Sequence, residues 1–306
     1  MKTAVVTGAN SFVGNAVVRE LLAHGIEVYA LIHGCHANRL PNSERLHTIS
    51  FDMQQPSTLQ LPLRTYDVFY HFAWVGGTNV EARKDAGLQL ANAAWTAEIV
   101  QQAQKAGCRR FVGAGSIMER EVAAACSTQG CHPGMGYCYG AGKLAAHMIA
   151  QSIAASSNME FVWGILTNAY GVGERSTRMV NTAIRKCIAG EPPQFTAATQ
   201  NYDFIYIDDV ARAFYCIGAK GKSFHEYLIG SGTAKTLKTF LLEMQAAIAP
   251  DLEFRFGDIP FTGTNLPLAS FDTSAIEQDT GFVAKVPFAD GVRRTRDWFC
   301  EEEQNG

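Results

Sequence analysis

Tyr139 and Lys143 are the two residues of this chain whose types and spacing point most directly to chemistry. They lie four residues apart at the start of a stretch with helical spacing, 139–150, so both side chains share one helix face. A neighbouring ammonium stabilises a phenolate and lowers the pKa of the tyrosine, which can then exchange a proton with a substrate hydroxyl or carbonyl. Ten tyrosines make one such pair unremarkable by chance. Whether the pair is catalytic therefore has to be judged from the other residues that the fold places beside it.

Ser116 supplies that context. It lies just after the apolar run 110–114, which we expect to be a strand, and therefore at the carboxyl edge where parallel sheets bind ligands. A hydroxyl at this position can hydrogen-bond the reacting oxygen. We predict Ser116, Tyr139 and Lys143 as the catalytic residues of an enzyme that acts on a secondary alcohol or ketone.

A glycine-containing turn near the N-terminus predicts a dinucleotide site. Residues 7–14 read Thr-Gly-Ala-Asn-Ser-Phe-Val-Gly and lie between an apolar run, 3–7, and a helical pattern, about 12–24. Backbone N–H groups of such a turn and the N-terminus of the following helix bind a pyrophosphate. Ser11 stands where the usual pattern has its middle glycine. The predicted cofactor-binding residues of this turn are Gly8, Asn10, Ser11, Phe12, Val13 and Gly14.

The end of the second strand bears on the choice between NAD and NADP. NAD-preferring sites usually place an acidic residue there to bind the ribose hydroxyls, whereas this chain has Leu-Ile-His-Gly at 31–34. With His33 and Arg39 nearby and no carboxylate to repel a 2′-phosphate, NADP is slightly favoured over NAD. Alternatively, both are solvated loop residues. Asp52 either accepts a hydrogen bond from the adenine amino group or is an ordinary surface aspartate.

Strands and helices alternate along the part of the chain that carries these residues. This alternation predicts an α/β fold of the Rossmann type, a doubly wound parallel sheet with helices on both faces. The expected strands are 3–7, 26–32, 47–51, 67–72, 110–114 and 160–166, with helices at 12–24, 88–106 and 139–155, and beyond about residue 174 an aromatic strand at 202–207 and helices near 236–249 and 289–301.

The looser pattern beyond residue 174 suggests a second unit. We predict a dinucleotide-binding domain of residues 1–173 plus about 203–230, and a smaller C-terminal α/β substrate lobe of residues 174–202 and 231–306. No low-complexity tract or flexible linker separates them. The two parts are therefore expected to pack as one unit.

Composition and charge narrow the choice of partners. The 306 residues are 47% hydrophobic and 18% charged, which suits a globular enzyme with a sizeable core. With 26 Lys and Arg against 29 Asp and Glu, we expect a small-molecule partner, no nucleic acid and no membrane. The N-terminus runs directly into a strand pattern and no apolar stretch is long enough to span a bilayer. We therefore expect a cytoplasmic protein.

The eight cysteines are scattered along the chain, which favours reduced thiols over a disulfide framework. Cys126, Cys131, His132 and Cys138 cluster in sequence but lack the paired spacing of a metal site. We predict no metal.

Further motifs follow in order along the chain: Asp-Val-Phe-Tyr-His-Phe-Ala at 67–73, Asn-Ala-Tyr-Gly-Val-Gly at 168–173, Asp-Phe-Ile-Tyr-Ile-Asp-Asp-Val-Ala at 203–211 and Tyr-Leu-Ile-Gly-Ser-Gly at 227–232. Together with the turn and the catalytic residues, they resemble the motifs of the extended short-chain dehydrogenase/reductase family. This family includes nucleotide-sugar epimerases, dehydratases and 4-ketoreductases. The resemblance runs nearly from end to end.

The resemblance implies additional site residues and a partner. Besides the turn, the cofactor would be bound by Met53, Phe72, Ala73, Trp74, Asn92, Tyr139 and Lys143. It implies substrate-binding roles for Asn168, Arg178 and Tyr202. Members commonly dimerise through helices like those expected at 88–106 and 139–155, so a homodimer is expected.

Two departures from the family limit the prediction. Dehydratases usually follow the catalytic hydroxyl with Asp-Glu, whereas Ile117 and Met118 stand here, so dehydration is disfavoured although Glu119 is close. The family often clamps the substrate diphosphate with arginines, but Tyr202 and the arginine-free run 261–274 occupy those places. These two places therefore argue against a nucleotide-linked sugar. Either the cations at the start of the substrate lobe substitute for the missing arginines, or they belong to a solvated helix face; they are Arg175, Arg178, Arg185 and Lys186.

We predict an NAD(P)-dependent sugar epimerase that transfers a hydride at a secondary alcohol carbon, C4 of a sugar that is nucleotide-linked. An NADPH-dependent 4-ketoreductase of a similar sugar is the alternative, because the two reactions share one half-reaction. A non-catalytic NAD(P)-binding sensor is a third reading. The intact Ser116, Tyr139 and Lys143 argue against it.

Overall fold

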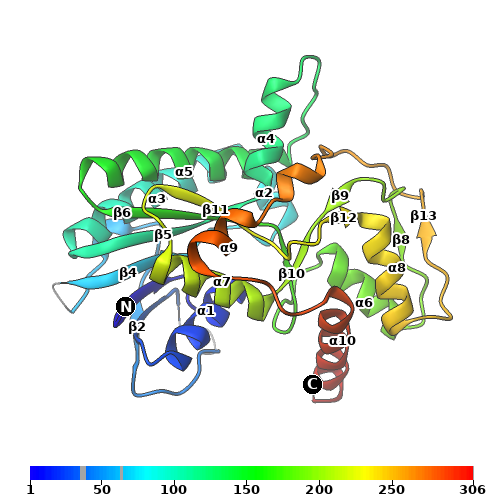
Figure 1. The fold of residues 1–306 in the computed structure, drawn as a ribbon, viewed down its shortest axis with the longest axis horizontal. Coiled ribbons are helices and arrows are strands. Elements are labelled where there is room, and N and C mark those ends of the chain that lie inside the picture. The colour runs from blue at the N-terminus through cyan, green and yellow to red at the C-terminus, as the bar shows by residue number, and fades with distance from the viewer. Residues whose placement is uncertain (35–38, 63–64, 306) are drawn as a thin grey trace.

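The centre of the molecule is a parallel β-sheet. In this computed structural model, which describes residues 1–34, 39–62 and 65–305, seven strands pair in the order β11-β6-β5-β4-β1-β2-β3 (Figure 1). They are β1 (Thr3–Thr7), β2 (Glu27–Ile32), β3 (Leu46–Ser50), β4 (Tyr66–His71), β5 (Cys108–Ser116), β6 (Glu160–Leu166) and β11 (His225–Ile229), and every pair is parallel. The predicted Rossmann-type sheet is confirmed.

Long helices cover both faces of the sheet (Figure 1). On one face α1 (Phe12–Ala23) packs against α7 (Ile207–Lys220), and on the other α3 (Ala86–Lys105) packs against α5 (Tyr137–Ser156). The central strands are therefore buried on both sides. Val5, Val68 and Phe111 are fully inaccessible to solvent, which explains why these strands read as continuous apolar runs rather than as alternating ones.

The carboxyl ends of the central strands meet at one edge of the sheet. Thr7 is in register with His71, and Ser116 is in register with Leu166. The strand order reverses between β1 and β4. In doubly wound sheets ligands bind outside the carboxyl ends at such a reversal, so the fold places Ser116 and the turn after Thr7 at the same edge.

Short elements follow the sheet in the C-terminal part. The two-stranded sheets pair β7 (Asn168–Tyr170) with β10 (Phe204–Tyr206), β9 (Asn201–Tyr202) with β12 (Lys235–Thr236) and β8 (Gln194–Phe195) with β13 (Arg255–Phe256). The helices are α6 (Met179–Ile188), α8 (Leu237–Ile248), α9 (Ser274–Thr280) and α10 (Phe288–Asn305). Earlier in the chain lie the short helices α2 (Val80–Lys84) and α4 (Met118–Ser127), and 3-10 turns occupy Pro56–Thr58 and Leu268–Phe271.

The single aromatic strand expected at 202–207 is wrong. The segment is divided between β9 and β10, and Ile207 already begins α7. Asp203 lies at the break and is fully buried. Its carboxylate accepts hydrogen bonds from the backbone N–H and the hydroxyl of Ser231. This buried anchor turns the chain from one small sheet to the other.

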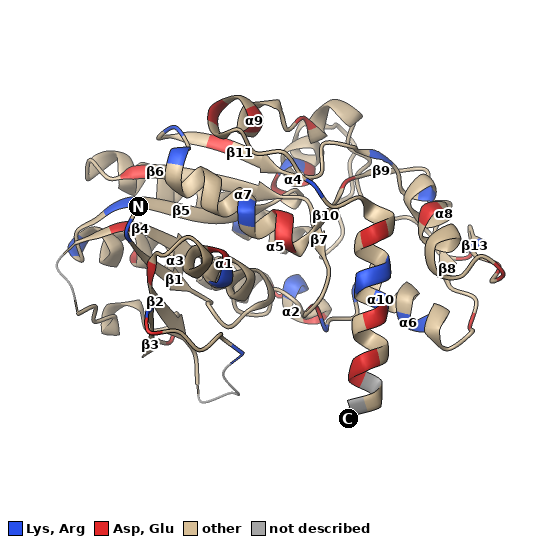
Figure 2. Cartoon of the chain, turned by 60° about the horizontal axis from the view of Figure 1, so that its bottom comes forward, with Lys and Arg blue, Asp and Glu red and all other residues tan. Residues whose placement is uncertain are grey.

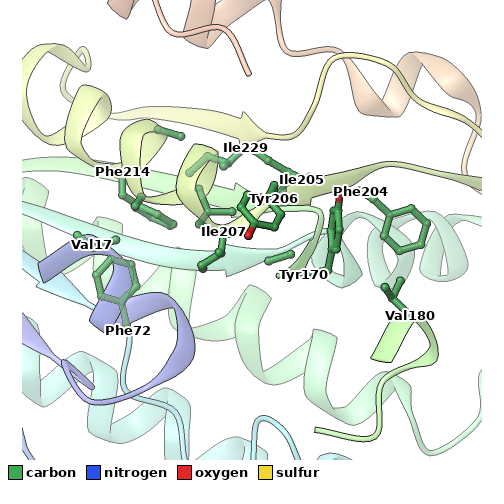
Figure 3. Packing of buried hydrophobic residues seen from close by; sticks show 14 of the residues in the cluster. Val17, Phe72, Tyr170, Val180, Phe204, Ile205, Tyr206, Ile207, Phe214 and Ile229 are labelled. Carbon is green, nitrogen blue, oxygen red and sulfur yellow. The ribbon is translucent and has the colours of Figure 1, made fainter. Parts of the chain in front are cut away.

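One hydrophobic cluster connects the sheet helices with the C-terminal elements (Figure 3). It runs from Val17 of α1 through Phe72 and Phe214, whose ring centroids lie 4.8 Å apart. It continues to Phe204, which packs 5.0 Å from Phe240 of α8. The two parts of the chain therefore share one core, while the boundaries that we assign to the domains stay a prediction.

The surface carries charges of both signs. Figure 2 shows lysines, arginines and acidic residues interspersed over the visible elements, including α10. Among the described residues, no helix combines the length and the apolar character that a membrane span needs, and no group of three or more His, Cys, Asp or Glu residues is placed to hold a metal ion.

Candidate active site

The turn between β1 and α1 has the geometry that a dinucleotide requires. Gly8 has φ +61°, and a Cβ there would lie 2.7 Å from the backbone nitrogen of Ala73. A Cβ on Gly14 would lie 2.1 Å from the carbonyl oxygen of Gly8. Because a side chain at either position would collide with the backbone, both positions require glycine. Ser11 has extended backbone and caps α1 by accepting a hydrogen bond from Gly14 N at 3.1 Å, so no glycine is needed there.

A buried hydrogen-bond network holds β4 against this turn. The hydroxyl of Thr7 accepts hydrogen bonds from the backbone N–H groups of Phe72 and Ala73, and lies 2.8 Å from His71 Nδ1. The other ring nitrogen of His71 lies 3.1 Å from the hydroxyl of Thr96. Burial lowers the pKa of His71 to about 3, so the ring is neutral. Phe72 and Ala73 are thereby fixed beside Gly8.

Asn92 supports the loop after β4, and its cofactor-binding role stays a prediction. Its side chain is fully buried in α3. Its amide hydrogens are donated to the carbonyl oxygens of Val75 and Leu88, and its oxygen accepts from Val75 N at 2.8 Å. Through these hydrogen bonds Asn92 shapes the loop after β4.

The predicted adenosine-binding residues gather at the ends of β2 and β3. His33 Nδ1 lies 3.5 Å from a carboxylate oxygen of Asp52, and Met53 is buried behind them. Arg39 follows residues 35–38, which include Cys35 and lie outside the described part of the chain. Its backbone N–H donates to Asn10 Oδ1 at 3.2 Å.

Arg39 also borders the larger of two cavities near the site. This cavity, of about 530 Å³, lies between α1, α7 and α10 and includes Asn10, Ser11 and Phe12 at one end. None of the predicted catalytic residues lines it. The chemistry therefore has to be sought in the second, smaller cavity.

That second cavity brings the predicted catalytic and substrate-binding residues together. We call it the active-site pocket: about 420 Å³ at the carboxyl edge, bounded by β5, α4, α5 and α6. Five residues singled out from the sequence line it, namely Ser116, Tyr139, Asn168, Arg178 and Tyr202. The side chain of Asn168 donates to the carbonyl oxygen of Asp203 at 3.0 Å, which fixes its orientation.

Lys143 lies beneath the pocket and does not line it. Its Nζ donates to the carbonyl oxygen of Ala114 at 2.9 Å and lies 3.8 Å from the centre of the Trp74 ring. The distance from Nζ to the centre of the Tyr139 ring is 6.0 Å. Burial lowers the pKa of Lys143 to about 7, while the negative charge of Glu119 acts in the opposite direction.

The cations that act on Tyr139 differ from the predicted one. We expected Lys143 to lower the pKa of this tyrosine. Instead burial raises the pKa of Tyr139, and the charges of Arg83 and Arg178 and a hydrogen bond with Ser116 lower it in part. Burial therefore favours the protonated phenol, and the positive field at its oxygen comes from arginines on α2 and before α6.

Glu119 is a buried support of Ser116. Its Oε1 accepts hydrogen bonds from the backbone N–H of Ser116 at 2.8 Å and from Trp163 Nε1 at 3.3 Å, and its Oε2 lies 3.1 Å from His147 Nδ1. Only 3% of Glu119 is exposed, and it does not line the active-site pocket. These hydrogen bonds hold the Glu119 carboxylate behind Ser116.

Two residues of the pocket were missed by the sequence analysis. Arg83 of α2 places its guanidinium carbon 4.1 Å from the centre of the Tyr139 ring. Glu121 of α4 lines the same pocket, and burial raises its pKa against the charge of Arg83. Met118 and Glu121 are three residues apart and share the face of α4 that borders the pocket, a spacing that becomes informative only once α4 is recognised as a helix.

A family comparison agrees with this geometry. Residues 4–230 match the NAD dependent epimerase/dehydratase family. The chain belongs to this family. It is an enzyme family of the extended short-chain dehydrogenase/reductase type, as the sequence predicted.

The curated relatives that this chain matches are distant. The dTDP-glucose 4,6-dehydratase of Neisseria gonorrhoeae is 25% identical over 176 residues, which cover 54% of this chain and 51% of the relative. The chain thus spans about half the length of the curated relatives that it matches.

Two solved structures share the whole fold of this family member. WbmF of Bordetella bronchiseptica, in complex with NAD+ and UDP, has a TM-score of 0.79 at 19% identity over 99% of this chain and 94% of its own. UDP-glucuronic acid 4-epimerase of Bacillus cereus, in complex with a UDP-4-deoxy-4-fluoro-glucuronic acid and NAD, has a TM-score of 0.79 at 18% identity over 98% and 99% of the two chains.

Proposed function

We propose that this enzyme is an NAD-dependent 4-epimerase of a nucleotide sugar. The observation that supports it most strongly is the placement of Ser116 and Tyr139 in one pocket, at the sheet edge that also holds the dinucleotide turn. A nicotinamide dinucleotide bound on this turn would supply the hydride acceptor and donor. The close contacts at Gly8 and Gly14 hold the turn tight against α1 and the loop after β4, as a dinucleotide-binding turn needs.

The residues of the pocket divide the proton chemistry among themselves. The hydroxyl of Ser116 donates a hydrogen bond to the reacting sugar oxygen and orients it toward Tyr139. The phenolic oxygen of Tyr139 takes the hydroxyl proton of the substrate and later returns it to the same oxygen. Arg83 and Arg178 supply the positive field that favours the phenolate, and the ammonium of Lys143, beneath the pocket, would hold the nicotinamide ribose.

The shape of the pocket suits a nucleotide sugar. Asn168, Arg178 and Tyr202 line the side toward α6 and the small sheets, and we assign them to the substrate. Arg178 is exposed at the start of α6 and can meet a diphosphate. The fold neighbours with UDP and with a UDP-sugar support this class of substrate.

For the cofactor we favour NAD. The sequence favoured NADP because no acidic residue ends β2, but the fold brings the carboxylate of Asp52 from the end of β3 to 3.5 Å from His33. A carboxylate here repels a 2′-phosphate and can accept hydrogen bonds from ribose hydroxyls. The fold neighbour with NAD+ agrees with this choice.

The 4-ketoreductase alternative uses the same groups but exchanges its cofactor at every turnover. Denaturing freshly purified protein and analysing the released nucleotide by mass separates the two. Stoichiometric NAD+, with interconversion of the two C4 epimers of a UDP-sugar followed by NMR without added cofactor, is the expected result. An empty protein that reduces a 4-keto sugar only with added NADPH would overturn the epimerase assignment.

We also propose a homodimer formed through α3 and α5. Leu90 of α3 is 65% exposed, and Met148 and Ile149 of α5 are 55% and 43% exposed. Apolar side chains exposed on two adjacent helices are typical of an association surface. Light scattering after size exclusion should give twice the 33.3 kDa of one chain, and Leu90→Glu should reduce it to a monomer. A monomeric wild-type protein would contradict the proposal.

A further inference from the structure

Arg83 is a cation of the active-site pocket that forms no ion pair with a carboxylate of the described residues. Its guanidinium lies over the ring of Tyr139 and contacts Met118 Sδ at 2.7 Å. Among the residues that the structure describes, no carboxylate forms an ion pair with it. Burial lowers the pKa of Arg83, while the negative charge of Glu121 in the same pocket opposes this shift. Buried charges are normally paired, so an anion from outside the chain is the natural partner.

The backbone around Arg83 is fixed. Asn79 caps α2 by accepting a hydrogen bond from Ala82 N at 2.9 Å, and the side chain of Gln89 donates to the carbonyl oxygen of Ala82 at 2.7 Å. A Cβ on Gly76 would lie 2.6 Å from Cβ of Ala82, so the preceding loop packs directly against the helix. The helix α2, which carries Arg83, is therefore held in place by the contacts of Asn79, Gln89 and Gly76 with Ala82.

The planar shape of the Arg83 guanidinium indicates which anions it can bind. The guanidinium of Arg83, which lies over the Tyr139 ring, lines the active-site pocket with its planar fork of N–H groups. This fork matches the two oxygens of a carboxylate. The nearest acidic group of the chain in the pocket is Glu121, whose pKa is raised by burial. Burial favours the neutral form of Glu121 and the charge of Arg83 opposes it, and among the described residues no ion pair joins the two side chains.

We propose that Arg83 binds a carboxylate on the sugar ring next to the carbon whose oxygen faces Tyr139, so that the substrate is a nucleoside-diphosphate uronic acid. This inference rests on the proposed function. The diphosphate cannot be the partner of Arg83, because it is attached at C1, across the ring from C4. A carboxylate at C5 is adjacent to C4 and lies at the reacting end, where Arg83 stands.

The test compares the binding of two probes, UDP-glucuronic acid and UDP-glucose, which differ only at C6, a carboxylate in the first and a hydroxymethyl group in the second. Their dissociation constants are measured by calorimetry on the NAD+-loaded protein, in the wild type and in Arg83→Met and Arg83→Lys. Lys84→Met is the matched control, since Lys84 lies next in the same helix and pairs with Glu81 at 2.7 Å. Melting temperatures verify that each variant is folded.

We expect the wild type to bind UDP-glucuronic acid at least about tenfold more tightly than UDP-glucose. Arg83→Met should abolish this ratio without weakening UDP-glucose, Arg83→Lys should retain part of it, and Lys84→Met should leave it unchanged. Equal affinities in the wild type, or an equal loss for both probes in Arg83→Met, would overturn the carboxylate assignment while leaving the nucleotide-sugar function intact. Failure of both probes and of UDP to bind would overturn the proposed function and this inference together.

Discussion

The cofactor side and the substrate side of the site are built in different ways. On the cofactor side, glycines, a capping serine and the Thr7–His71 pair satisfy one another within the backbone. On the substrate side, Arg83 and Glu121 project charged groups from short helices into a pocket, without an ion-pair partner among the described residues. The first region is complete before any ligand binds, whereas the second has groups that a substrate would have to satisfy.

The largest effect that this comparison predicts comes from a substitution that disturbs the backbone of the dinucleotide turn. In Gly14→Ala the new Cβ would lie 2.1 Å from the carbonyl oxygen of Gly8, and neither backbone can move without separating α1 from β1. We expect NAD affinity to fall by at least about 100-fold, which fluorescence titration can measure. Ser11→Gly is the matched control. It removes only a side-chain cap, so binding within about threefold of the wild type is expected.

A second change tests the buried support that links the two sides. Glu119→Gln keeps a side chain of the same shape but removes the charge that raises the pKa values of Lys143 and Tyr139. Activity that needs the Lys143 ammonium is lost as the pH rises through the pKa of Lys143. The substitution lowers this pKa, so the fall of kcat at high pH should begin about one pH unit lower. His147→Gln leaves the charge of Glu119 in place. If this control shifts the profile to lower pH equally, the electrostatic role assigned to Glu119 is wrong.

A smaller effect concerns stability. Burial holds the pKa of Lys143 at about 7 in the folded state, while the unfolded lysine keeps its proton up to about pH 10. The unfolded chain therefore binds more protons between pH 7 and 10, and folding stability rises with pH across this window. In Lys143→Met the rise should disappear, and the free energy of unfolding at pH 6 should increase by roughly 1–3 kcal/mol. Urea titration at pH 6 and 9 measures both, and a decrease at pH 6 would contradict the account.

Most of the fold could be predicted from the sequence, because the central strands are buried on both faces and therefore appear as continuous apolar runs. Apolar runs such as 3–7 and 160–166 coincide with β1 and β6, and alternation with helical patterns then implies a parallel sheet. The edge where those strands end could also be inferred. This is why Ser116 and Tyr139, far apart in sequence, were expected together and do line one pocket.

Side-chain direction was the part that the sequence could not specify. The spacing of Tyr139 and Lys143 placed them on one helix face, but not the turn of Lys143 Nζ toward the carbonyl oxygen of Ala114. Arg83 was missed because α2 has five residues, too few for a periodic pattern. The role of Asn92 depends on a loop backbone that only the folded chain creates.

The measurement that tests the central claim most directly is the comparison of cofactor binding and turnover in Tyr139→Phe. The ring and its contacts with Arg83 and Trp74 are retained, so only the proton-carrying hydroxyl is lost. We predict unchanged NAD content and a loss of about 100-fold or more in kcat for a nucleotide sugar. Turnover at the wild-type rate would contradict the assignment of Tyr139 as the acid and base of this enzyme.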